Sequence, residues 1–123
     1  MNETLNLSPL EIEFNNLILN DKKNTNLHLI AKATCSIYSI SINELRSKSR
    51  LHSIAIARHN FIVIAYKTHL YSYRALGVYL NNRDHSTMLH GVRAHNDLHD
   101  TDKFYRQKYQ EILELIKHYK IEN

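Results

Sequence analysis

The chain has 123 residues, which is the size of one main domain with a hydrophobic core. It carries a formal net charge of +4, one cysteine, two glycines and one proline. Its apolar runs are too short for a membrane span, its first residues do not begin a secretory signal, and one cysteine cannot form an internal disulfide. We therefore expect a cytoplasmic protein built from helices joined by short polar turns.

Basic charge is concentrated in the middle of the chain. Between Glu44 and Arg93, eight lysines and arginines stand against two acidic residues, so this half carries +6 and the remainder carries −2. Such a concentration indicates a polyanionic partner, and phosphate backbones are the commonest one. A solubilised helical surface accounts for the charge about as well, so the charge alone leaves both interpretations open.

Residues 1–23 are interpreted as an N-terminal helical extension or linker, and residues 24–123 as the main domain. Ser8-Pro9-Leu10-Glu11 is typical of a helix start, and apolar residues follow it as far as Leu19. Asn20 to Asn26 is polar and marks the boundary. The extension is expected to pack on the main domain, to mediate self-association, or to contact replication or transcription proteins.

The next segment predicts two helices followed by a basic loop. Apolar spacing predicts a helix from Leu27 to about Tyr38, in which Cys35 is a buried thiol. The hydroxyl of Thr34 can bond to a carbonyl one turn earlier. Ser41 and Glu44 fit the capping box of a short helix that ends near Lys48. The stretch 47–52 is basic, polar and without periodicity, so we expect an exposed loop.

Ser53 to about His69 is the most apolar part of the chain. Its β-branched residues from Phe61 to Tyr66 would also suit a strand. The run is long, lacks glycine and proline, and has no partner strand nearby. We therefore predict a buried central helix, followed by a turn at residues 68–71.

A pair of helices around a tight turn comes next. Ser72 caps a helix to about Leu80, and Asn81-Asn82 suits a turn because asparagine tolerates the left-handed conformation. Asp84 is an N-cap for a helix that runs to about His99. Its apolar stripe leaves a polar first turn, as suits N-terminal insertion into a DNA major groove. The residues outside that stripe are His85, Ser86, Thr87, His90 and Arg93.

A last helix is predicted after Asp102, its N-cap. Its inward stripe comprises Tyr105, Tyr109, Ile112, Leu113, Leu115 and Ile116. We expect most tyrosines of the chain to lie in or beside the core and not to form a platform on which single-stranded bases stack.

Enzymatic and metal-binding functions are less favoured. His95 and His99 stand one helical turn apart, but a zinc site needs three or four convergent ligands, so we interpret them as surface or interface histidines. Asp84 and His85 imitate an acid and base pair, yet adjacent helical residues do not face each other. We expect no catalytic residues, no metal and no cofactor; a metal-dependent nuclease is the less favoured alternative.

The stretch Arg83-Asp84-His85-Ser86-Thr87-Met88-Leu89-His90 resembles a known signature, Arg-Asp-His-Thr-Thr-Val-Leu-His. This signature belongs to the C-terminal DNA-binding domain (domain IV) of the bacterial chromosomal replication initiator DnaA. Leu45 to Ala65 resembles the basic loop and long helix of that family, and Ser72 to Leu80 the first helix of its helix-turn-helix. The resemblance covers roughly Asn24 to Tyr119. It implies an all-α, Trp-repressor-like helical bundle with a helix-turn-helix.

The resemblance also implies roles for individual residues. In the major groove, base contacts fall on Asp84, His85, Ser86 and Thr87, with Arg58 on the long helix beside them. In the minor groove, the base contact falls on Arg50 of the basic loop, and arginine favours narrow A·T-rich minor grooves. Phosphate contacts are assigned to Lys48, Lys67, Ser72 and Arg74.

The chain departs from the family pattern at several positions. His59 replaces a glutamine, Tyr66 replaces a lysine, Asn81-Asn82 replaces two glycines, and Ser86 replaces a threonine. These changes bear on which DNA sequence is preferred. A Gly-x-x-x-x-Gly-Lys-Ser/Thr phosphate loop does not occur in the sequence, so the initiator's ATPase is not expected.

The sequence thus predicts a stand-alone module that binds double-stranded DNA sequence-specifically. We expect it to bind as a monomer at DnaA-box-like sites, associated with the nucleoid, as a transcription regulator or replication accessory factor. The alternative is a non-catalytic protein-interaction module that keeps the fold without specific DNA binding.

Overall fold

The computed structural model describes Pro9, residues 27–67 and residues 71–122, with side chains as far as residue 119. Every element in the two long described ranges is a helix, so the fold is all-α as predicted. The extension at residues 1–23, the linker at 20–26 and most of the turn at 68–71 lie outside the described residues. None of the described helices is both long and apolar enough to cross a membrane.

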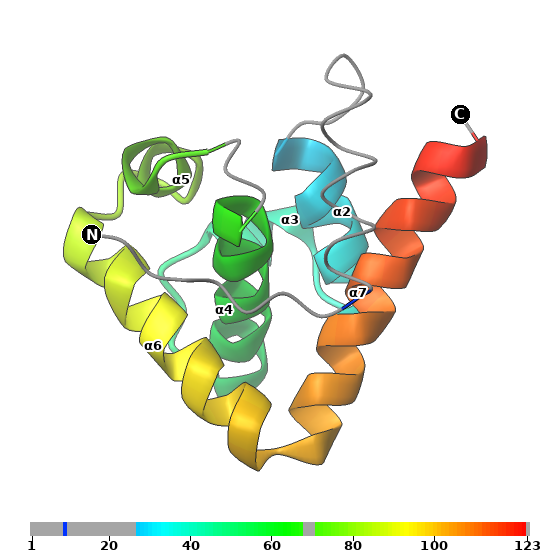
Figure 1. The fold of residues 1–123 in the computed structure, drawn as a ribbon. Coiled ribbons are helices and arrows are strands. Elements are labelled where there is room, and N and C mark those ends of the chain that lie inside the picture. The colour runs from blue at the N-terminus through cyan, green and yellow to red at the C-terminus, as the bar shows by residue number, and fades with distance from the viewer. Residues whose placement is uncertain (1–8, 10–26, 68–70, 123) are drawn as a thin grey trace.

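The six described helices follow the predicted order. They are α2 (Leu27–Tyr38), α3 (Ile42–Arg46), α4 (His52–Lys67), α5 (Tyr73–Tyr79), α6 (His85–Thr101) and α7 (Lys103–Glu122). Figure 1 shows α4 between α6 and α7, which diverge from a sharp junction. Helix α4 packs against α2, α3, α5 and α6, and α7 packs against α2 and α6. The predicted buried central helix is therefore confirmed.

Local signals start most of these helices where the sequence predicts. Ser41 and Glu44 form the expected capping box of α3. Ser72 caps α5 by accepting a bond from the Ala75 amide, and Asp84 caps α6. Each cap satisfies a backbone donor that has no partner inside the helix. The registers of α5 and α6 are thus fixed locally.

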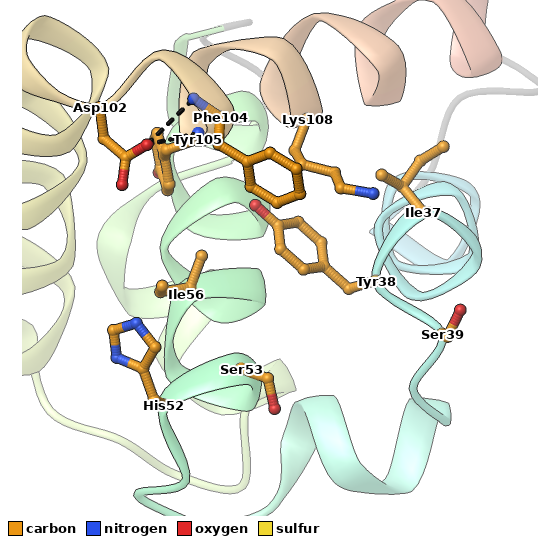
Figure 2. Close-up of a pocket in the computed structure, with 10 residues that line it drawn as sticks. All are labelled: Ile37, Tyr38, Ser39, His52, Ser53, Ile56, Asp102, Phe104, Tyr105 and Lys108. Carbon is orange, nitrogen blue, oxygen red and sulfur yellow. Dashed lines mark hydrogen bonds between the residues drawn. The ribbon is translucent and has the colours of Figure 1, made fainter.

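The α6–α7 junction is capped in the same way. One oxygen of Asp102 accepts bonds from the amides of Phe104 and Tyr105, as Figure 2 shows. Tyr105 then lies buried against His95 of α6, with His95 Nδ1 2.5 Å from the tyrosine hydroxyl oxygen. His95 is only 1% exposed, so the prediction of a surface or interface histidine is wrong at this position. Aromatic rings of α7 enclose it, and sequence spacing alone did not indicate them.

The core is formed by apolar side chains from all six helices. In α2, Thr34 donates to the Ile30 carbonyl, and Cys35 is a buried free thiol, both as predicted. In α4, Phe61 and four apolar residues after it are at most 1% exposed. Because α4 is covered on several sides, it lacks a polar face in this stretch. That explains why its sequence also resembles a strand.

Candidate nucleic-acid interface

The first turn of α6 is held by Asp84. Its Oδ1 atom accepts from the Thr87 amide at 2.9 Å, from Ser86 Oγ at 2.8 Å and from Thr87 Oγ1 at 2.9 Å. These bonds, led by the one from the Thr87 amide, lower the pKa of the Asp84 carboxyl group. The carboxylate is exposed, so an ordered and ionised acceptor stands at the N-terminus of α6.

His85 lies on the side of α6 that adjoins α5. Its ring packs edge-on against Tyr73, with centroids 5.0 Å apart, and Tyr73 stacks on Tyr66 at 4.5 Å. The three rings join the end of α4 to the starts of α5 and α6. His85, Tyr66 and Tyr73 line a cleft of about 580 Å³ together with Ser72, Arg74 and Leu89. The structure therefore brings together three predicted DNA-contacting residues, namely His85, Ser72 and Arg74.

A second cleft lies on the other side of α6, against the basic loop. Its volume is about 490 Å³, and its lining includes Lys48, Arg50, Arg83, Thr87 and His90. Lys48 and Arg50 are exposed, while Ser47 and Ser49, which precede them in turn, are half-buried. The cleft brings the predicted minor-groove arginine and a predicted phosphate contact next to Thr87 of the first turn. The N-terminal part of α6 thus stands between two clefts, one lined by several cations and the other by Arg74.

Arg58 lines the same basic-loop cleft and is bonded to the backbone of the loop. Its side chain is 6% exposed. The guanidinium donates to the carbonyls of Leu45, Ser47 and Ser49 at distances of 2.8 to 3.2 Å. Three of the five N–H donors of Arg58 are thus used by loop carbonyls, a placement that fits support of the basic loop.

Lys67 lines neither of the two clefts. Its ammonium nitrogen is 5.6 Å from the centroid of the Tyr109 ring on α7. A cation over an aromatic face is an attractive arrangement in itself. Lys67 is half-buried, whereas Lys48 and Arg74, the other two cations among the predicted phosphate contacts, are exposed.

Histidines add to the basic-loop cleft. His59 of α4 and His90 of α6 meet edge to face, with centroids 6.4 Å apart. Burial lowers the pKa of His59 to about 4, and the charges of His90 and Arg58 add to the effect. His59 is therefore neutral at pH 7. Within the described part of the chain, no three His, Cys, Asp or Glu side chains are grouped closely enough to hold a metal ion.

Several residues connect the loop to the helix-turn-helix through contacts that the sequence did not indicate. Arg83 donates to the carbonyl of Ser47, and Asn81 donates to the carbonyl of Arg46. The Nε of Arg46 in turn donates to the carbonyl of Tyr79. The position of Arg83 inside the eight-residue signature was the available signal. The partners are more than thirty residues apart in sequence, so no local pattern identifies them.

A third groove is separate from these clefts. It measures about 430 Å³ and lies between the end of α2 and the starts of α4 and α7 (Figure 2). Phe104, which lines it, is 68% exposed. The predicted DNA-contacting residues are absent from the lining of this groove.

Comparison with known proteins gives the family. Residues 27–94, more than half of the chain, match the family model described as bacterial dnaA protein helix-turn-helix. The chain belongs to this family. The match includes the basic loop, all of α4 and α5, and the first ten residues of α6. The family predicted from the signature is confirmed. Membership of the DnaA helix-turn-helix family supports DNA binding.

The chain is also similar to curated DnaA initiators. It is 27% identical to the chromosomal replication initiator protein DnaA of Chlorobaculum tepidum, over 94% of this chain and 24% of that protein. The corresponding protein of Bacteroides thetaiotaomicron is 24% identical over 94% of this chain and 25% of its own length. That of Porphyromonas gingivalis is 27% identical over 78% and 20%. The chain thus spans about a quarter of the length of the relatives it matches.

Proposed function

We propose that this chain binds double-stranded DNA sequence-specifically, with the N-terminus of α6 in the major groove and Arg50 in the adjacent minor groove. The observation that carries the proposal is the pair of clefts that flank the first turns of α6. One cleft contains the exposed cations of the loop, and the other contains Arg74 and the start of α5. Cations on both sides of a recognition helix suit the two phosphate strands that border a groove.

Base contacts are proposed for the first turn of α6. Asp84 uses one carboxylate oxygen for its cap, and its other oxygen can accept from a cytosine amino group. His85, Ser86 and Thr87 follow it and can contact purine or thymine edges. Arg50 is proposed for the minor groove because A·T-rich minor grooves carry enhanced negative potential.

Phosphate contacts are proposed for Lys48, Ser72 and Arg74. All three are exposed. We leave Arg58 and Lys67 out of the contact set, because the first is bonded to loop carbonyls and the second lies over Tyr109. At the level of the cell, we propose a transcription regulator or replication accessory factor that acts at sites like those of the DnaA initiators.

The proposal is tested by selecting bound duplexes from a random library. We expect one short, A·T-containing sequence to be enriched. His85→Ala should weaken binding to the enriched duplex by about 1–3 kcal/mol and leave binding to random DNA almost unchanged. The matched phosphate variant Arg74→Ala should weaken both duplexes to the same degree.

Two outcomes would contradict the proposal. Selection that enriches no sequence would remove specific DNA binding and favour a protein-interaction module. A His85→Ala variant that weakens selected and random duplexes equally would remove the major-groove assignment of α6. Circular dichroism of both variants establishes that a loss of affinity is not a loss of fold.

A further inference from the structure

Two arginines donate hydrogen bonds to the backbone of the basic loop. Arg58 of α4 donates from Nε to the Leu45 carbonyl at 3.0 Å, from one terminal nitrogen to Ser47 at 2.8 Å, and from the other to Ser49 at 3.2 Å. Arg83, which directly precedes the cap of α6, donates to the same Ser47 carbonyl at 2.5 Å. One carbonyl thus links the central helix, the loop and the start of the recognition helix.

The bonded carbonyls alternate with the exposed cations. Carbonyls of residues 45, 47 and 49 are bonded to the inner arginines, whereas the side chains of Lys48 and Arg50 are exposed. Leu45 belongs to α3, and the backbone is extended at Ser47, where the helix ends. In extended backbone, successive side chains project to opposite faces. Holding the carbonyls of Ser47 and Ser49 inward therefore fixes which residues of the loop are available to DNA. The register of the loop depends on these bonds.

The charges of the two arginines are balanced by carbonyl dipoles. Burial lowers the pKa of Arg58 to about 10, and the positive charge of Arg83 adds to this shift. Burial, and then the charge of Arg50, lowers the pKa of Arg83. Both groups remain protonated at pH 7. A planar guanidinium can donate along several directions at once, whereas a lysine ammonium is a compact charge that cannot span three carbonyls.

We propose that Arg58 and Arg83 are positioning residues, which hold the basic loop so that Arg50 enters the minor groove in register with α6 in the major groove. This inference rests on the proposed function. A loop ordered before binding avoids the entropy cost of ordering it on the DNA. A loop tied to the start of α6 also keeps a constant spacing between the two groove-contacting elements.

The test uses two chemically modified copies of the library-selected duplex. Replacing adenine by 2,6-diaminopurine adds an amino group to the minor-groove edge, where guanine carries its own amino group, and leaves the major-groove contacts in place. Replacing thymine by uracil removes the major-groove methyl group and leaves the minor groove unchanged. The wild-type chain should lose about tenfold in affinity on each modified copy.

Arg58→Lys keeps the charge and removes the three-way bonding. We expect the affinities of this variant for the unmodified and diaminopurine duplexes to lie within about twofold of each other, as those of Arg50→Ala should. On the uracil duplex it should lose as much affinity as the wild-type chain. The double variant Arg50→Ala/Arg58→Lys should distinguish the unmodified from the diaminopurine duplex no less than either single variant does. Arg106→Lys is the matched control, because this arginine of α7 also donates to a backbone carbonyl, that of His99, but lines neither cleft; it should behave as wild type.

The outcomes separate this inference from the proposed function. A wild-type chain without a selected duplex, or without a diaminopurine penalty, would contradict the proposed DNA binding mode. If Arg58→Lys loses as much affinity on the diaminopurine duplex as the wild-type chain does, the positioning role alone is overturned. If Arg58→Lys loses less affinity than wild type on the uracil duplex, Arg58 is instead a major-groove contact. If Arg58→Lys fails to fold, the same measurement is made on Arg83→Lys, which removes only the bond to Ser47. An Arg83→Lys variant that keeps the full affinity loss on the diaminopurine duplex overturns the inference.

Discussion

The imidazole of His59 lies in the wall of the basic-loop cleft and contacts the ring of His90. Its Nδ1 atom is buried and has no hydrogen-bond partner among the described residues. The neighbouring charges are all positive, so protonation inside the fold is opposed by burial and by repulsion. A neutral imidazole here keeps the wall of the cleft compact at pH 7.

This environment predicts an acid-sensitive stability. The pKa of His59 is about 4 in the fold and near 6.5 in the unfolded chain. Between these values the unfolded chain binds a proton that the folded chain does not, so the free energy of unfolding falls as pH is lowered from 6.5 to 4. Urea denaturation at pH 7 and pH 5 measures the loss.

The substitution His59→Gln should make that loss smaller. Glutamine is the residue of the family pattern at this position, and its side chain does not titrate. His28→Gln, at an exposed position of α2, is the control and should leave the pH dependence unchanged. If wild type and His59→Gln lose the same stability between pH 7 and pH 5, the burial of a neutral imidazole is not what sets the pH response.

The turn between α5 and α6 shows how backbone geometry sets the position of a whole element. Asn81 and Asn82 have φ values of 63° and 61°, so the predicted left-handed asparagines are confirmed. The Arg83 amide donates to the Gly77 carbonyl at 2.9 Å. A Cβ atom on Gly77 would lie 2.2 Å from the Arg83 carbonyl oxygen, so only glycine allows the turn to fold back this closely.

Gly77→Ala should therefore displace the start of α6. Because the clash is with backbone, relief requires the turn to move, and we expect a destabilisation of about 1–3 kcal/mol. DNA affinity should fall further than stability explains, since Arg83 and Asp84 move with the turn. Thermal unfolding and duplex titration measure the two effects. The neighbouring variant Val78→Ala, at a side chain 59% exposed, should be close to neutral in both; an equally neutral Gly77→Ala would refute the requirement.

Val78 shows a limit of sequence patterns at the scale of an element. It is apolar, yet the structure leaves it exposed on α5. In a helix of seven residues the apolar stripe is too short for periodicity to distinguish a packed face from an exposed one. Contact with α4 and α6 decides which residues of α5 are buried, and these are Tyr73, Leu76 and Gly77.

At the scale of the whole molecule, charge is distributed unevenly. The basic half from Glu44 to Arg93 includes the loop, α4, α5 and the first nine residues of α6, whereas Asp97, Asp100 and Asp102 follow it at the end of α6 and its C-cap. Lys48, Arg50, Arg74 and Arg93 are exposed cations of this half. Their charge attracts DNA independently of its sequence.

Salt should therefore weaken binding in a defined way. If these four cations each neutralise one phosphate, log affinity falls against log salt with a slope of about −3.6, which is roughly a 150-fold loss between 50 and 200 mM. Arg74→Ala should reduce the slope by about one unit. The reversal Lys103→Glu, at an exposed residue of α7, should leave the slope unchanged. A slope near zero would mean that phosphates are not the anions being bound.

Local chemistry determined most of the fold of this protein. Ser41, Ser72, Asp84 and Asp102 act through backbone groups within a few residues of themselves, so capping signals and apolar spacing were sufficient to predict helices α2 to α7. The signature from Arg83 to His90 likewise indicated the family, because its eight residues are contiguous.

The tertiary structure decided the environment of each side chain. Arg58 and Arg50 are both arginines of a basic segment, and only the fold separates one bonded to three carbonyls from one exposed beside α6. His95 and His90 differ in the same way, because the rings of α7 enclose the first and leave the second exposed. Burial and long-range hydrogen bonds arise from contacts between elements, and residues thirteen to thirty-six positions apart leave no periodic trace in the sequence.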